Sequence, residues 1–107
     1  MPAHGKLSAM AEPTVKEVMR EIAATDPDFE AGVSRFDVRV GEDSNGLPGI
    51  FIKVVLADKT IREYWPHRNA FKEALRRRLW KRFPDSFPFV WFSAESEAIN
   101  PEVPASA

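Results

Sequence analysis

The sequence contains no cysteine, and this absence removes several kinds of chemistry at once. Without thiols there is no disulfide framework, no thiolate nucleophile and no cysteine-ligated metal site, which suits a reducing compartment. Long apolar runs are also missing: the longest, around residues 50–57, falls far short of the ~20 residues that a membrane span needs. Residues 1–10 hold no apolar signal core, so we expect a cytoplasmic protein with no membrane contact.

The chain has no overall excess of one charge either. Its 15 Lys and Arg residues against 16 Asp and Glu residues give a formal net charge of -1, which argues against a nucleic-acid coat or a membrane-surface protein. A length of 107 residues allows one hydrophobic core. Residues 1–12 and 94–107 are rich in Ala, Ser, Pro and Glu, so we expect flexible tails around a single domain, 13–93.

The domain is expected to begin with a short amphipathic helix. Thr14 and Glu17 have the spacing of a capping box, which predicts the start of a helix. The residue before a proline avoids the α region, so Asp26-Pro27 predicts its end. Between these signals, apolar residues recur at the i, i+3, i+4, i+7 spacing of one buried stripe: Val15, Val18, Met19 and Ile22.

Two strands joined by a hairpin are expected next. Apolar residues alternate with charged ones from Phe36 to Val40, the pattern of a strand with one face in the core. Asn45-Gly46 then predicts a tight turn into the apolar run 50–56. This second strand is apolar on both sides, because Phe51 and Val55 alternate with Ile50, Ile52, Val54 and Leu56. The face that carries Phe51 and Val55 is therefore a candidate contact surface.

A long helix and a third strand complete the domain. Large apolar residues recur every four positions within Thr60–Phe83, and Pro66 is expected in the first turn of that helix. Pro84 and Pro88 end the pattern, and residues 89–92 read as an aromatic edge strand. The order predicts an α+β fold, α-β-β-α-β, in which two helices cover one face of a three-stranded sheet.

Positive charge is concentrated on the long helix. Eight basic residues against two acidic ones between Arg62 and Arg82 give a local charge of about +6. At ~100° per residue, Arg77 and Lys81 lie away from the apolar stripe and could follow phosphates. Arg78 and Arg82 lie close to the stripe and are expected to cover the core with their stems. The alternative is an ordinary solvated helix face, neutralised by the acidic remainder of the chain.

Trp80 does not fit the apolar stripe, because helical spacing puts it on the side opposite Leu75 and one turn after Arg76. An exposed tryptophan beside arginine is typical of an interface hot spot or of a stacking platform for an unpaired base. The alternative is that Trp80 folds under the C-terminal tail or against residues 64–66.

Signals for catalysis or metal binding are weak. Glu42, Asp43 and Asp58 lie at strand ends, but the ligand spacing of a hard-cation loop is missing, and hairpin solubility explains them better. His4 and His67 are far apart in the sequence and do not have zinc-site spacing. No nucleophile elbow, P-loop or dinucleotide fingerprint is present. We therefore expect a protein that is not an enzyme and needs no metal or cofactor.

Two resemblances bear on function. The order of elements is similar to type II KH-like folds such as ribosome-binding factor A and the BolA family, although residues 69–83 lack the helix-GxxG-helix of a KH domain. More specifically, Gly41-Glu42-Asp43-Ser44 with Gly46 and Pro48, the run 50–58 and the stretch 87–97 resemble a family of small bacterial proteins. Such proteins occur beside HEPN-type or nucleotidyltransferase-type partners, which implies an accessory or antitoxin-like role.

The sequence thus favours two functions. The first is docking of a protein partner, or of a second copy as a homodimer, through an apolar sheet face or the Trp80 side of the long helix, with contact residues Trp80, Arg76, Arg77, Phe51, Val55 and Trp91. The second is RNA or DNA binding through the basic helix face, with contact residues Arg68, Arg76, Arg77, Lys81 and Trp80. Phosphate binding should weaken steeply with salt, whereas apolar docking should hardly respond.

Overall fold

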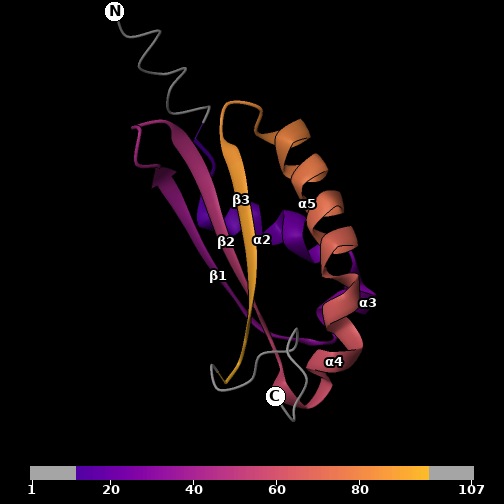
Figure 1. Cartoon of the computed structure of the whole chain (residues 1–107). Coiled ribbons are helices and arrows are strands. Elements are labelled where there is room, and N and C mark those ends of the chain that lie inside the picture. Colours follow the sequence, from indigo (N-terminus) through magenta and orange to yellow (C-terminus); the bar gives the residue numbers. More distant parts are fainter. Residues whose placement is uncertain (1–11, 97–107) are drawn as a thin grey trace, which may run out of the picture.

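The structure is a computed structural model of the chain and describes residues 12–96. Its elements are α2 (Val15–Ala23), α3 (Pro27–Glu30), β1 (Val33–Glu42), β2 (Pro48–Leu56), α4 (Ile61–Tyr64), α5 (Arg68–Arg82) and β3 (Phe87–Ala94), with two 3-10 turns, η1 (Asp58–Thr60) and η2 (Trp65–His67), on either side of α4. The α+β class is confirmed, with the expected α-β-β-α-β order elaborated by short helices (Figure 1). Most of the expected tails, 1–12 and 94–107, lies outside the described residues, although β3 runs through Ala94.

The capping box predicted for α2 is present. The Thr14 hydroxyl accepts a hydrogen bond from the Glu17 N–H at 3.1 Å, and the Glu17 carboxylate accepts one from the Thr14 N–H at 2.9 Å. These bonds satisfy two backbone donors that a helix start otherwise leaves unpaired. Of the predicted stripe, Val18 and Ile22 are buried, whereas Val15 and Met19 are exposed. Only half of the stripe therefore faces the core.

The predicted hairpin is confirmed, because β1 and β2 pair antiparallel around residues 43–47. Gly46 has a φ of 79°, a conformation that costs glycine little. One Asp43 carboxylate oxygen accepts hydrogen bonds from the N–H groups of Asn45 at 2.8 Å and Leu47 at 2.9 Å. The turn chemistry thus fixes the register of the two strands.

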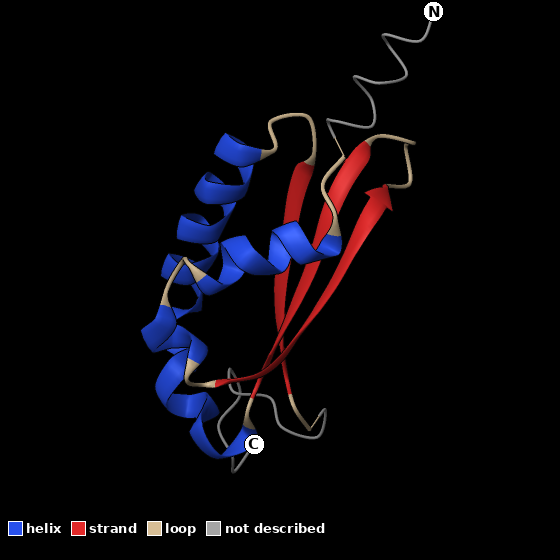
Figure 2. Ribbon diagram, turned by 180° about the vertical axis from the view of Figure 1, so that it is seen from behind, coloured by secondary structure: helices blue, strands red, loops and turns tan. Residues whose placement is uncertain are grey.

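The sheet has the order β1-β2-β3, with β2 in the centre, antiparallel to β1 and parallel to β3. Both α2 and α5 lie on one face of it (Figures 1 and 2). On that face, alternate residues of β2 are fully buried against residues of both helices: Ile50, Ile52, Val54, Leu56, Val18, Ile22, Phe71, Leu75 and Leu79. The opposite face, which we call the open face, carries the other half of each strand.

The prediction of a single helix over Thr60–Phe83 is wrong for the first part of that range. Helix α5 begins at Arg68, and the preceding residues form α4 and the two 3-10 turns. Pro66 lies at the start of η2, where it lacks the N–H that a continuous helix requires. The proline therefore separates two helices instead of opening one, while the expected uninterrupted helix over residues 69–83 is present to within one residue.

Helix α3 was not expected from the sequence. Its N-cap is Asp26, whose carboxylate accepts a hydrogen bond from the Phe29 N–H at 3.1 Å, and Pro27 lies in its first turn. The Asp-Pro pair that ends α2 therefore also starts α3. Phe29 is buried and stacks on Phe71 with ring centroids 4.5 Å apart, which ties this short helix to α5.

Within residues 12–96, none of the helices combines the length and the hydropathy that crossing a lipid bilayer requires.

Candidate protein-docking surface

A row of aromatic rings runs from α5 onto the open face, and we call it the aromatic ladder: Trp80 of α5, Phe87 and Phe89 of β3, and Phe51 of β2. Trp80 meets Phe87 edge to face at 5.2 Å, and Phe87 meets Phe89 at 4.7 Å. Phe51 and Phe89 are cross-strand neighbours that stack at 5.0 Å with only 3° between their planes. Such ring pairs stabilise one another beyond their buried area, so the ladder is a preformed surface.

Exposure is concentrated at the Trp80 end of the ladder and beside it. Trp80 is 44 % exposed, Phe87 38 % and Trp91, the next open-face residue along β3, 46 %. Large aromatic side chains at this level of exposure, gathered in one place, distinguish a contact surface from apolar residues scattered singly.

Cations frame the ladder. The Arg39 guanidinium lies 4.0 Å above the Phe51 ring, and that of Arg76 lies 5.3 Å above the Phe87 ring. Both arginines are placed by secondary structure: Arg39 is the cross-strand neighbour of Phe51, and Arg76 is one helical turn before Trp80. Aromatic rings with arginine at their margin are the composition of protein interface hot spots.

The faces of the central rings are already occupied. Phe51 has Arg39 on one side and Phe89 on the other, and Phe89 has Phe51 and Phe87 as neighbours. A ring that stacks on a nucleic-acid base must present a free face. The ladder and the neighbouring Trp91 therefore present ring edges and two tryptophans, an arrangement better suited to apolar side chains than to bases.

A groove of about 340 Å³ adjoins the ladder between α5 and the edge strand β3. Residues 87–91 line one side, and Lys72 and Arg76 line the other. Arg76 has one long ion pair, 3.8 Å to Glu73, and its Nε is buried with no hydrogen-bond partner among the described residues. A second hollow, of about 350 Å³, lies between Trp91 and the charged residues of β1 and β2: Asp37, Arg39 and Lys53.

Comparison with known proteins yields one informative similarity. No protein-family model matches the sequence, and no curated protein matches it. The fold resembles a metal-bound domain. That domain is the metal-bound C-terminal domain of the CzcD transporter from Cuprividus metallidurans, with a TM-score of 0.51 and 20 % sequence identity over 76 % of this chain and 99 % of that one. At this identity the likeness shows the fold alone, and the resemblances to KH-like folds and to the small bacterial family stay predictions.

Of the three acidic residues predicted at strand ends, Asp43 and Asp58 have structural partners. The Asp43 carboxylate closes the hairpin turn, and that of Asp58 accepts a hydrogen bond from the Ser96 N–H at 2.9 Å. Glu42 is exposed at the end of β1. Within residues 12–96 no group of three or more His, Cys, Asp or Glu side chains could hold a metal ion, and His4 lies outside that range.

Of the predicted protein-contact residues, Trp80, Arg76, Phe51 and Trp91 meet at or beside the ladder. Val55 is on the open face but only 1 % exposed, so the expectation that it contacts a partner is wrong for this structure. Arg39 and Lys72 were not among the contact residues predicted from the sequence. Their positions follow from the β1–β2 register and from the packing of α5 beside β3, which no local pattern specifies.

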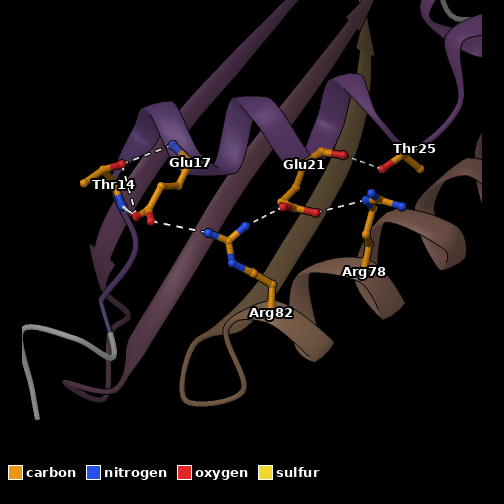
Figure 3. A network of polar contacts seen from close by, with 6 residues as sticks. All are labelled: Thr14, Glu17, Glu21, Thr25, Arg78 and Arg82. Atoms are coloured by element: carbon orange, nitrogen blue, oxygen red, sulfur yellow. Dashed lines mark hydrogen bonds and ion pairs between the residues drawn. The ribbon is translucent and has the colours of Figure 1, made fainter.

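The predicted nucleic-acid residues do not form one surface. The Arg68 guanidinium donates a hydrogen bond to the Trp65 carbonyl at 2.9 Å and lies 4.4 Å above its ring, whereas Arg77 and Lys81 are exposed. Arg78 and Arg82 face α2 instead, where Glu21 accepts hydrogen bonds from both, at 2.9 and 2.6 Å (Figure 3). Part of the positive charge of α5 is therefore paired with a carboxylate of α2.

Proposed function

We propose that this domain is a non-enzymatic protein-interaction module that docks a protein partner through the aromatic ladder and Trp91. The observation that carries the proposal is the exposure of Phe87 and Trp91 on a sheet face that neither α2 nor α5 covers (Figure 1), with the exposed Trp80 of α5 packed against Phe87. Monomeric proteins seldom leave a large contiguous apolar patch open to water, so a binding partner is the ordinary explanation for one.

Base stacking is the competing function for the same residues, and the ring geometry favours protein. Phe51 and Phe89 use their faces on each other and on Arg39, and the Arg76 guanidinium lies over the ring of Phe87, which leaves the two tryptophans as the rings best placed to take a base. Arg68 is engaged by Trp65. Arg77 and Lys81 alone of the predicted phosphate contacts remain exposed and without an ion pair among the described residues.

The proposal that the protein is not an enzyme is supported by what its carboxylates do. Asp43 and Asp58 accept backbone hydrogen bonds that close a turn and fasten the end of β3. For the partner, the resemblance to small bacterial proteins suggests a HEPN-type or nucleotidyltransferase-type protein, to which this chain would be an antitoxin-like accessory. A second copy of the chain is the other protein partner that an apolar surface could take.

Matched variants test the proposal. Each tryptophan leaves roughly 100 Å² to bury, worth about 2.5 kcal/mol, so Trp80→Ser or Trp91→Ser should weaken partner binding by well over ten-fold. Val15→Ser and Met19→Ser remove exposed apolar side chains from α2 and serve as controls. Proteins captured from the native host by the wild-type chain are compared across the four variants by quantitative mass spectrometry, and captured candidates are then titrated as purified proteins.

Two results would count against docking at the ladder. One is a partner that binds the tryptophan variants as tightly as the wild-type chain. The other is tight binding of a single-stranded oligonucleotide that is lost with Arg77→Gln and falls by orders of magnitude between about 50 and 200 mM salt, since that slope marks phosphate contacts.

A further inference from the structure

Backbone hydrogen-bonding groups of β3 point outward along its outer edge, away from β2. Among the described residues β3 pairs with β2 and with no other strand. The Glu95 N–H donates to the Leu56 carbonyl at 2.8 Å, which fixes the alternation: odd-numbered residues turn their backbone groups toward β2 and even-numbered ones turn theirs outward. The outward donors are the N–H groups of Val90, Phe92 and Ala94. Pro88, which has no N–H, also falls in the outward set, where its missing donor breaks no bond of the sheet.

The two edge strands of the sheet, β1 and β3, differ in how readily they can pair with an added strand. Strand β1 carries Arg35, Asp37, Arg39 and Glu42, and charges of this kind discourage pairing at an edge. Strand β3 has no charged residue among its eight. Apart from Pro88, nothing in its sequence protects this edge, so β3 is the one able to accept another strand.

The groove beside the β3 edge favours an added strand that carries negative charge. Lys72 and Arg76 form its far side, and the buried Nε of Arg76 has no partner among the described residues. A carboxylate in the groove would pair with the Lys72 ammonium and with the Arg76 guanidinium, whose ion pair with Glu73 is long at 3.8 Å. The wall of the groove therefore complements carboxylates.

From these observations we infer that the edge of β3 binds an extended peptide segment of the partner in which acidic and apolar residues alternate. The inference rests on the proposed function, because it identifies the part of the partner that docks. The added strand would pair with the outward groups of Val90, Phe92 and Ala94. Successive side chains of a strand point to opposite faces, so one set meets Lys72 and Arg76 while the other lies beside Phe89 and Trp91.

The same charges argue against a second copy as the occupant. Pairing β3 with its own copy about a two-fold axis would bring the two α5 helices, each lined with Lys72 and Arg76, to the same junction. Like charges at a symmetric interface repel, and the groove would remain without its acceptor. An acidic strand supplies carboxylates opposite Lys72 and Arg76, whereas a second copy would place two more cations there.

The experiment uses an eight-residue capped peptide of alternating glutamate and valine, equal in length to β3. Amide chemical shifts of the isotope-labelled chain are followed to millimolar peptide, so that weak binding is detected. Two control peptides have lysine in place of glutamate, or the same glutamates and valines in two blocks. Arg76→Gln is compared with Arg77→Gln, the neighbouring change of the same charge on a residue outside the groove.

The expected shifts centre on Val90, Phe92 and Ala94, with affinity about ten-fold lower for Arg76→Gln and unchanged for Arg77→Gln. The inference is overturned by an absence of shifts, by equal binding of either control peptide, by equal effects of the two arginine variants, or by light scattering that shows a dimer which the peptide dissociates. With the natural partner, loss of binding on Trp91→Ser but not on Arg76→Gln would reject the groove and leave docking at the ladder standing. Loss on neither would reject both.

Discussion

Glu21 fastens α2 to α5, and replacing it by glutamine should measurably destabilise the domain. Its carboxylate is 14 % exposed and pairs with Arg78 at 2.9 Å and Arg82 at 2.6 Å, from two turns of α5 (Figure 3). Both arginines are 45 % exposed, so water screens each pair, and exposed pairs contribute about 0.2–1 kcal/mol. Two pairs on one carboxylate give an expected loss of about 1 kcal/mol, or roughly 5 °C in melting temperature for a small domain.

The assay is urea denaturation followed by circular dichroism at low salt and at about 1 M salt, where surface electrostatics are largely screened. Glu42→Gln, an exposed change on the hairpin, is the control and should be neutral. Combining Glu21→Gln with Arg82→Gln should cost less than the sum of the single changes, because the residues share an interaction. A loss of equal size at both salt concentrations would refute an ionic origin and indicate altered packing.

Two further predictions concern local structure. Hydrogen bonds from the Thr14 backbone N–H, and then from its hydroxyl, hold the pKa of Glu17 below its ordinary value of 4.5. The ionised form is therefore stabilised by folding, so the stability difference between the wild-type chain and Glu17→Gln should persist from neutral pH to about pH 5 and disappear as the pH falls through the folded pKa; a difference that is unchanged at about pH 3 would contradict this. Gly32→Ala should destabilise by about 1–3 kcal/mol in urea denaturation, because a Cβ there would overlap the Tyr64 ring, and a neutral result would mean that the ring moves aside freely.

Features set by neighbouring residues were predictable from the sequence. The capping box at Thr14, the hairpin at Gly46 and the two-sided character of β2 all depend on contacts within a few positions, and the structure contains each of them. The interruption at Pro66 was misjudged because a proline in a first turn looks the same in sequence whether the helix begins there or a preceding helix ends there.

The candidate site was predictable in composition but not in arrangement. Trp80 is exposed as its helical position indicated, whereas Val55, on the same open face as Phe51, is buried. The stacking of Phe51 on Phe89 needs the parallel β2–β3 register, which is set by the crossover through α5 and by no turn. Local sequence patterns therefore could not predict the pairing of β2 with β3, or the ring contacts that depend on it.

The basic residues of α5 show how one helix can serve stability and binding separately. Residues four apart share a face, so Arg78 and Arg82 both reach α2, while Lys72 and Arg76 both line the groove beside β3. Arg77 and Lys81, a third pair of the same spacing, remain exposed to solvent. The first two pairs share no interaction partner. Arg82→Gln should therefore lower the free energy of unfolding without changing peptide affinity, and Arg76→Gln should lower peptide affinity without changing the free energy of unfolding. An Arg76→Gln variant that lost as much stability as Arg82→Gln would show that the charges act as one network and that this division of the helix is wrong.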